Sequence, residues 1–226
     1  MKSLVLLFLA ALAALALPAH GATVTLFADD RAGFDRAAGP LAIEDFNAFT
    51  ADASFGSGTL DLGAFTLSAT RRGDNRVETN PSDRFTIDGS PFARGAQRAG
   101  GQSLTIAFDA PIFAFGADFT DFNNRGRQSS LTLVGTAGST RVSISSVNGA
   151  GTTIFLGLVS DTAFTEVVIG RSGGDDLYGI DNLRFGGGAI GTTAVPLPGA
   201  LPLMLVGAGA LGLIARRKRL AAQLGS

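Results

Sequence analysis

Residues 103–109 read Ser-Leu-Thr-Ile-Ala-Phe-Asp, with a large apolar side chain at every second position. Successive side chains of a β-strand point to opposite faces, so Leu104, Ile106 and Phe108 would share one face. This period of two is typical of a strand with one buried side. The stretch therefore predicts a sheet that packs one face against a core.

The same alternation returns at 129–134 and 140–147. Further strands are expected at 23–27, 41–46, 58–69, 84–88, 112–119, 153–159, 164–170 and 178–185. Only residues 29–38 favour a helix, with an aspartate as N-cap and Gly39-Pro40 as the stop. Strands of this length and spacing predict a mainly β fold, an antiparallel jelly-roll-like β-sandwich with one short N-terminal helix, over residues 22–186.

The N-terminal segment has the pattern of a secretory leader. Lys2 precedes an apolar run that ends at Pro18, and Ala19-His20-Gly21 places small residues where a signal peptidase cuts. We therefore expect residues 1–21 to be a signal peptide, removed after Gly21 or Ala22. An uncleaved anchor helix is the alternative, and it gives the same topology.

The C-terminal segment has the pattern of a transmembrane helix. Residues 197–215 are apolar or small, and about 28 Å of helix is just enough to cross a bilayer core. Four cations follow at 216–219, and positive charge favours the cytoplasmic side. The preceding domain should then lie outside, joined to the helix by an uncharged linker at 187–195.

The order of these C-terminal features resembles a known family of sorting signals. The motif residues are Val195, Pro196, Leu197 and Pro198, and the basic cluster is Arg216, Arg217, Lys218 and Arg219. Segment 196–219 is similar to PEP-CTERM signals, and most of all to the Val-Pro-Leu-Pro-Ala variant, from which it differs at Gly199. The resemblance implies a Gram-negative, exopolysaccharide-producing bacterium, a biofilm setting, and an exosortase-type membrane protease as partner.

A second, more diffuse resemblance concerns the domain itself. Residues 153–161 and 178–185 are similar to ectodomains that often carry such a sorting tail. Those ectodomains look like small β-sandwiches that are distantly similar to carbohydrate-binding modules. This resemblance implies a fold rather than an activity.

Composition excludes several kinds of chemistry. The chain has no Cys, its only His is His20 in the leader, and its only lysines are Lys2 and Lys218. The domain therefore lacks the usual general base, thiol nucleophile and Schiff-base amine, and no Ser-His-Asp triad can form. With 13 Arg against 19 acidic residues, it also lacks the basic footprint of a nucleic-acid-binding protein. We expect no enzymatic activity, and a carboxylate-only hydrolase is the remaining enzymatic alternative.

The acidic residues suggest one candidate site. Glu44 or Asp45 on an early strand could meet Asp176 and Asp181, near the last strand, around a structural Ca²⁺, which prefers oxygen ligands. The alternative is that Asp175 and Asp176 are solvated turn residues and that Asp181 binds backbone amides.

Taken together, the sequence predicts an exported, non-enzymatic surface or extracellular-matrix protein. It would be anchored by one transmembrane helix or released to the surface, with exopolysaccharide as a possible partner. The alternative is a calcium-stabilised carbohydrate-binding module.

Overall fold

The computed structural model describes residues 22–56, 58–70, 74–80, 82–97, 102–123, 129–136, 138–144, 151–171 and 176–188. The predicted leader, nearly all of the linker and the sorting segment 196–219 lie outside these ranges. Within them, no helix is long and apolar enough to span a membrane.

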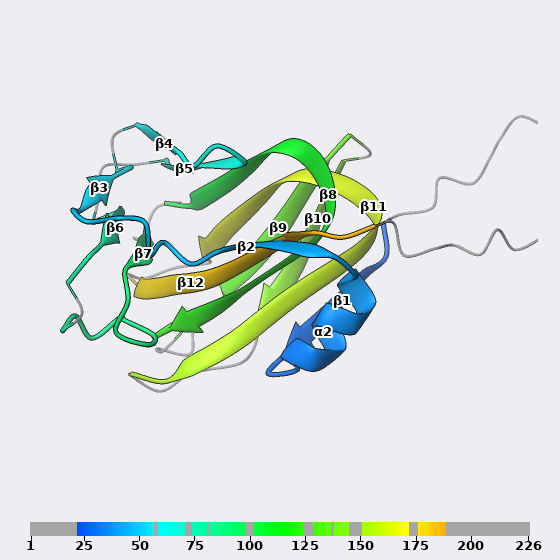
Figure 1. Ribbon diagram of the computed structural model, residues 1–226. Helices are drawn as coiled ribbons and strands as arrows, with labels where there is room; N and C mark the ends of the chain where they lie inside the picture. Colours follow the sequence, from blue (N-terminus) through cyan, green and yellow to red (C-terminus); the bar gives the residue numbers. More distant parts are fainter. Residues whose placement is uncertain are drawn as a thin grey trace, which may run out of the picture. The chain divides into compact units, whose positions relative to one another are not determined.

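The described chain is almost entirely strand, with one helix (Figure 1). The elements are β1 (Val24–Ala28), α2 (Arg31–Ala38), β2 (Leu41–Glu44), β3 (Ala53–Ser54), β4 (Thr59–Asp61), β5 (Phe65–Ala69), β6 (Arg76–Glu78), β7 (Phe92–Gln97), β8 (Leu104–Thr120), β9 (Ser129–Gly135), β10 (Gly138–Ile144), β11 (Thr153–Arg171) and β12 (Asp176–Gly186). All the strand pairs are antiparallel. The mainly β antiparallel prediction with one short helix is confirmed, and the jelly-roll connectivity stays a prediction.

Two long strands, β8 and β11, each contribute to two layers (Figure 1). Their segments 104–108 and 166–171 pair with each other and with β5 and β9, which gives the order β4-β5-β8-β11-β9-β10 in layer A. Their segments 112–120 and 153–160 form layer B, in the order β1-β11-β8-β12-β7-β6-β3, with β2 also beside β12.

The bends in these strands coincide with breaks in the hydrogen-bond ladder. In β8 the exposed residues Asp109, Ala110 and Pro111 fall between the two paired segments. Proline has no N–H for a ladder, so a bend of this kind is where a sheet tolerates it. In β11 the register shifts between Val159 and Phe164. For each bend the sequence predicts two separate strands, one before the bend and one after it, whereas the structure has one continuous strand.

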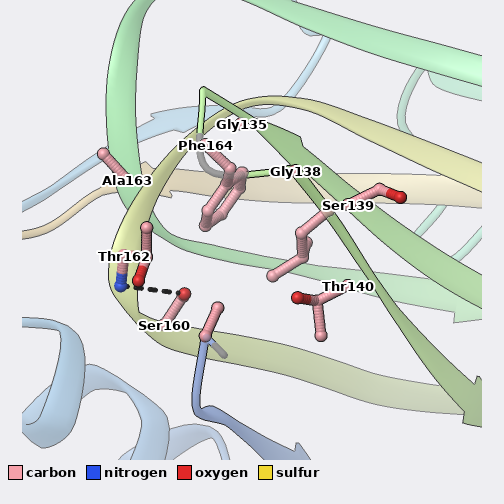
Figure 2. Close-up of a pocket in the computed structure, with 10 residues that line it drawn as sticks. Gly135, Gly138, Ser139, Thr140, Ser160, Thr162, Ala163 and Phe164 are labelled. Atoms are coloured by element: carbon pink, nitrogen blue, oxygen red, sulfur yellow. Dashed lines mark hydrogen bonds between the residues drawn. The ribbon is translucent and has the colours of Figure 1, made fainter. Parts of the chain in front are cut away.

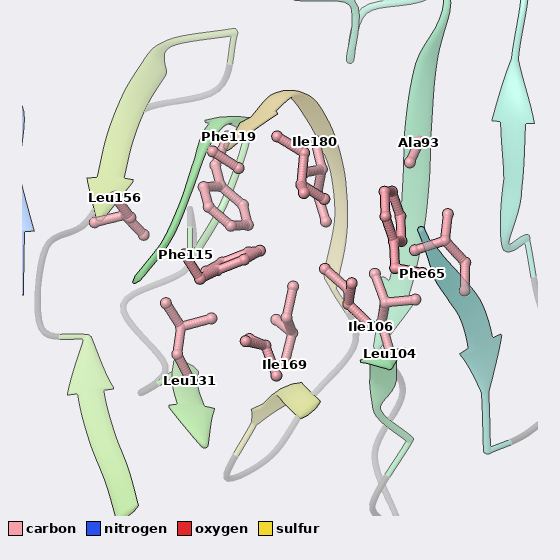
Figure 3. Packing of buried hydrophobic residues seen from close by; sticks show 14 of the residues in the cluster. Phe65, Ala93, Leu104, Ile106, Phe115, Phe119, Leu131, Leu156, Ile169 and Ile180 are labelled. Carbon is pink, nitrogen blue, oxygen red and sulfur yellow. The ribbon is translucent and has the colours of Figure 1, made fainter. Parts of the chain in front are cut away.

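The main core lies between the two layers (Figure 3). Layer A contributes alternate residues that include Phe65, Leu67, Leu104, Ile106, Leu131, Leu133, Val167 and Ile169. Layer B contributes Phe115, Ala117, Phe119, Ile154, Leu156, Leu158, Tyr178 and Ile180. The period of two that predicts the strands also predicts which of their side chains are buried.

A second cluster lies on the outer face of layer B, under α2. Asp30 caps the helix by accepting the Gly33 N–H at 2.8 Å, as expected. Phe34 is fully buried, with its ring 5.4 Å from the ring of Phe155. Gly157 of β11 leaves room for this ring, since a Cβ there would lie 2.5 Å from Phe34 Cδ2.

The prediction of a strand at 84–88 is wrong. Asp83 closes a turn there, because its carboxylate accepts the Phe85 N–H at 2.9 Å and its carbonyl accepts the Thr86 N–H at 3.1 Å. Such local side-chain hydrogen bonds compete with strand pairing. Phe85 is nevertheless buried against β12, where a Cβ on Gly179 would lie 2.1 Å from the Phe85 carbonyl oxygen. The strand in this region is β7, which the sequence pattern does not reveal.

Candidate functional site

The structure does not bring the four predicted calcium ligands together. Asp176 and Asp181 are five residues apart on β12, so they point to opposite faces and their Cα atoms are about 16 Å apart. Glu44 faces Leu183 across the β2–β12 ladder and accepts the Phe46 N–H at 2.8 Å. Asp45 accepts the Asn47 N–H at 3.1 Å. Across the described residues, no three His, Cys, Asp or Glu side chains are grouped to hold a metal ion.

Asp176 instead secures a turn. It is 4% exposed, and its Oδ2 accepts the Asn123 N–H at 3.0 Å. Asn123 has φ 61°, a left-handed conformation that asparagine tolerates better than most residues. The carboxylate therefore joins the end of β8 to the start of β12, whereas the alternative to the calcium site expected Asp176 to be a solvated turn residue.

Asp181 forms a buried pair with Asp118 on the outer face of layer B. The two are directly opposite in the β8–β12 ladder, where Cβ atoms are about 4.5–5.5 Å apart. Arg31 of α2 forms a salt bridge with Asp118, and Asn182 Nδ2 donates to Asp118 Oδ2 at 3.1 Å. Asp181 accepts the Asn182 N–H at 2.7 Å and the Ser90 hydroxyl at 3.3 Å. Asp118 thus has a cationic partner and Asp181 has only neutral donors.

The surroundings of Asp181 favour the protonated form of its carboxyl group. Burial raises the pKa of Asp181 to about 7, and the neighbouring Asp88 and Asp118 raise it in the same direction. The hydrogen bonds from Asn182 and Ser90 oppose the rise but do not cancel it. At neutral pH Asp181 is therefore close to half protonated. The next residue, Asn182, has φ 50° at an interruption of the β8–β12 register, which is how a bulge re-aims side chains.

Burial argues against catalysis by this pair. Two facing carboxyl groups, one of them with a raised pKa, are typical of glycoside hydrolases. Here Asp118 is 4% exposed and Asp181 is 1% exposed, so neither can reach a polymer in this conformation. The pair is better described as a structural feature in which Asp181 retains a proton. The sequence alone does not reveal this pair, because positions 118 and 181 meet only through strand pairing.

A second unpredicted feature is an arginine–carboxylate network on layer B. Arg94 pairs with Asp74 at 3.1 Å and Asp83 at 3.3 Å, and its guanidinium lies 4.9 Å from the centre of the Phe85 ring. Arg76 pairs with Glu78 at 2.5 Å, and also with Asp74. These two arginines are occupied within the domain, and they fix the turns around β6 and β7.

A pocket opens at the bend of β11, between the layers (Figure 2). Its volume is about 140 Å³, and its lining residues are Ala22, Leu133, Gly135, Gly138, Ser139, Thr140, Ser160, Thr162, Ala163 and Phe164. Leu133 and Phe164, which are 3% and 2% exposed, form an apolar base. The lining offers four hydroxyl groups and no charged side chain. A lining of hydroxyl groups without charge suits an uncharged, hydroxyl-rich group. That group must also be small, because the pocket is smaller than the about 300 Å³ at which typical small-molecule sites begin.

Comparisons with known proteins assign no family. No family model matches the chain, and no curated protein is significantly similar to it. Among solved structures, the K2 cleaved adhesin domain of Lys-gingipain matches at a TM-score of 0.41 and 9% identity, covering 65% of this chain and 99% of that one. A variant of the family 29 carbohydrate-binding module CBM29-2 matches at 0.40 and 8%, covering 70% and 100%. The module TmCBM61, in complex with β-1,4-galactotriose, matches at 0.33 and 13%, covering 57% and 91%. These similarities are too weak to carry an argument about this chain.

Proposed function

We propose that the chain is an exported, non-enzymatic surface or extracellular-matrix protein, displayed outside the inner membrane by a C-terminal transmembrane helix and sorted by an exosortase-type protease. One observation carries the proposal: motif, apolar segment and basic cluster follow one another at 195–219, directly after the β domain. The charge at 216–219 and the leader at 1–21 independently specify the same orientation.

The chemistry of the domain supports a non-enzymatic role. The domain is held by apolar packing and by arginine–carboxylate pairs, with no cysteine that a reducing or oxidising compartment could affect. The carboxyl pair that could perform acid–base chemistry, Asp118 and Asp181, is shielded from solvent.

Cell fractionation tests the export proposal. We expect the protein in the membrane or extracellular fraction, and intact-mass measurement should show that residues 1–21 or 1–22 have been removed. Replacing the basic residues 216–219 with serine should reduce retention in the inner membrane, because it removes the cytoplasmic charge signal. A full-length chain in the cytosol, with its leader intact, would contradict the proposal.

The pocket at the bend of β11 favours a second candidate, recognition of a neutral polysaccharide in the matrix. The full-length protein on a glycan array should then bind selected neutral glycans. Thr140→Val should weaken this binding, because it removes a hydroxyl from the pocket at nearly constant shape. The matched control Thr132→Val changes a threonine on β9 outside the lining. Equal binding to every glycan, or binding to none, would contradict glycan recognition and leave the structural role as the only one of the two proposals.

A further inference from the structure

The first described residues of the chain are held against the bend of β11. The N–H of Thr23 donates to Asp161 Oδ1 at 2.9 Å, and the N–H of Asp161 donates to the Thr23 carbonyl at 3.1 Å. The backbone bond extends the β1–β11 ladder beyond the Val24–Ser160 pair, and the Asp161 side chain adds the other bond. Ala22 lines the hydroxyl-rich pocket. The residues around the expected leader cleavage site are therefore part of the folded domain.

Covalent geometry places the new terminus near one carboxylate. If cleavage follows Ala22, the terminal nitrogen belongs to Thr23, which lies 2.9 Å from Asp161 Oδ1. If cleavage follows Gly21, the Ala22 nitrogen is three bonds from the Thr23 nitrogen, and hence within about 7 Å of that oxygen. Both distances are shorter than the Debye length of about 10 Å at 0.1 M salt, so the two opposite charges attract one another and do so most strongly at low salt.

We propose that leader removal after Gly21 or Ala22 creates an α-ammonium group that lies beside this pocket and pairs with the Asp161 carboxylate. The inference rests on the proposed export. Water hydrolyses the peptide bond, the leader keeps the new carboxylate, and the released amine takes up a proton. Processing thus adds a cationic group beside a pocket whose lining carries no charge, and adds an ion pair between the edge strand β1 and β11.

The surroundings leave Asp161 as the partner for this charge. None of the ten lining residues, which come from β9, β10, β11 and the chain start, carries a charged side chain. Arg141 of β10 is exposed and is not among the lining residues. Glu166 pairs with Val134 and Ala107 within layer A. The Thr23 N–H lowers the pKa of Asp161, which keeps this carboxylate ionised where an amine titrates.

Competitive amine labelling tests the pairing. The full-length chain is expressed with its own leader, purified after export, and pulsed with acetic anhydride between pH 6 and pH 10. Processed protein that keeps its C-terminal segment carries two amines, the terminus and Lys218, so mass spectrometry of the two labelled peptides gives the reactivity of the terminal amine relative to that of Lys218. The terminal amine should have a three- to tenfold smaller acid dissociation constant in the wild type than in Asp161→Asn at low salt. The Oδ1 of asparagine can still accept from the Thr23 N–H and from the Thr162 hydroxyl, which lies 3.0 Å from Asp161 Oδ1, so this variant removes only the charge.

Two controls separate the pairing from other effects. Asp109→Asn, at the corresponding bend of β8, should leave the terminal amine unchanged, since Asp109 is exposed on a different strand. Insertion of Gly-Gly between Ala22 and Thr23 should move the amine away from Asp161 after either cut, and should abolish the effect of Asp161→Asn. If the chain is cut at either expected site but its terminal amine titrates alike in the wild type and in Asp161→Asn, this inference is overturned and the export proposal stands. A chain that keeps its leader contradicts the export proposal and overturns both.

Discussion

Asp181→Asn should make the protein more stable at pH 8, by up to about 4 kcal/mol, and should remove most of the stability loss that the wild type shows between pH 4 and pH 7. The estimate follows from a pKa near 7 in the folded protein, against 3.8 for an ordinary aspartate, at about 1.36 kcal/mol per pH unit. The value is an upper bound because repacking around the new amide reduces it.

The sign follows from proton binding in the two states. Between pH 4 and pH 7 the folded protein holds a proton on Asp181 that the unfolded chain has released, so raising the pH favours unfolding. Below pH 4 both states are protonated, and above pH 7 the full cost of an ionised, buried Asp181 is present. An asparagine has no proton to release, and its amide can still accept from the Asn182 N–H and donate to Ser90 Oγ.

Urea unfolding at pH 5 and pH 8 would measure this effect. Asp61→Asn is the control, because Asp61 is exposed and accepts the Gly63 N–H in a turn, an interaction that asparagine preserves. The control should follow the wild-type pH profile. If Asp181→Asn were equally or less stable than the wild type at pH 8, an ionised, buried Asp181 would not destabilise the folded protein.

Local patterns in the sequence predict much of the fold because they depend on neighbouring residues. Alternation at 103–109 predicts which side chains of β8 are buried, and an aspartate before residue 31 predicts the helix cap. The same local rule fails at 84–88, where Phe85 and Ile87 alternate but Asp83 satisfies the backbone in a turn. Alternation shows that a residue is buried without showing whether a strand or a turn buries it.

The candidate sites could not be predicted in this way because long-range register creates them. Asp118 and Asp181 become neighbours only when β12 pairs with β8, and no motif indicates that pairing. The pocket at the bend of β11 joins residues near 22, 135 and 162 that share no local pattern. The expected calcium site failed for a related reason: residues 176 and 181 are close in sequence, but a strand places them far apart and on opposite faces.

Phe34→Ala should cost about 3–5 kcal/mol of unfolding free energy, because it empties a fully buried ring site. The ring is the main apolar contact of α2 with layer B, next to Phe27, Phe155, Gly116 and Gly157. Hydrogen exchange of α2 should therefore accelerate more than exchange in the main core. Urea unfolding gives the total cost, and an Arg36→Ala variant at an exposed position of the same helix should change it little.

A double-mutant cycle with Gly157 tests whether that ring requires the glycine. In the wild type, Gly157→Ala should cost about 1–3 kcal/mol, since the added Cβ lies 2.5 Å from Phe34 Cδ2. In the Phe34→Ala background the contact with the Phe34 ring is absent and only a 3.0 Å approach to Phe155 Cε1 is left, so the same change should cost less, with a coupling energy of about 1 kcal/mol or more. Gly170→Ala, on the same strand but 3.6 Å from its nearest neighbour, should be additive with Phe34→Ala. Equal costs of Gly157→Ala in both backgrounds would mean that α2 does not rest on layer B through this contact.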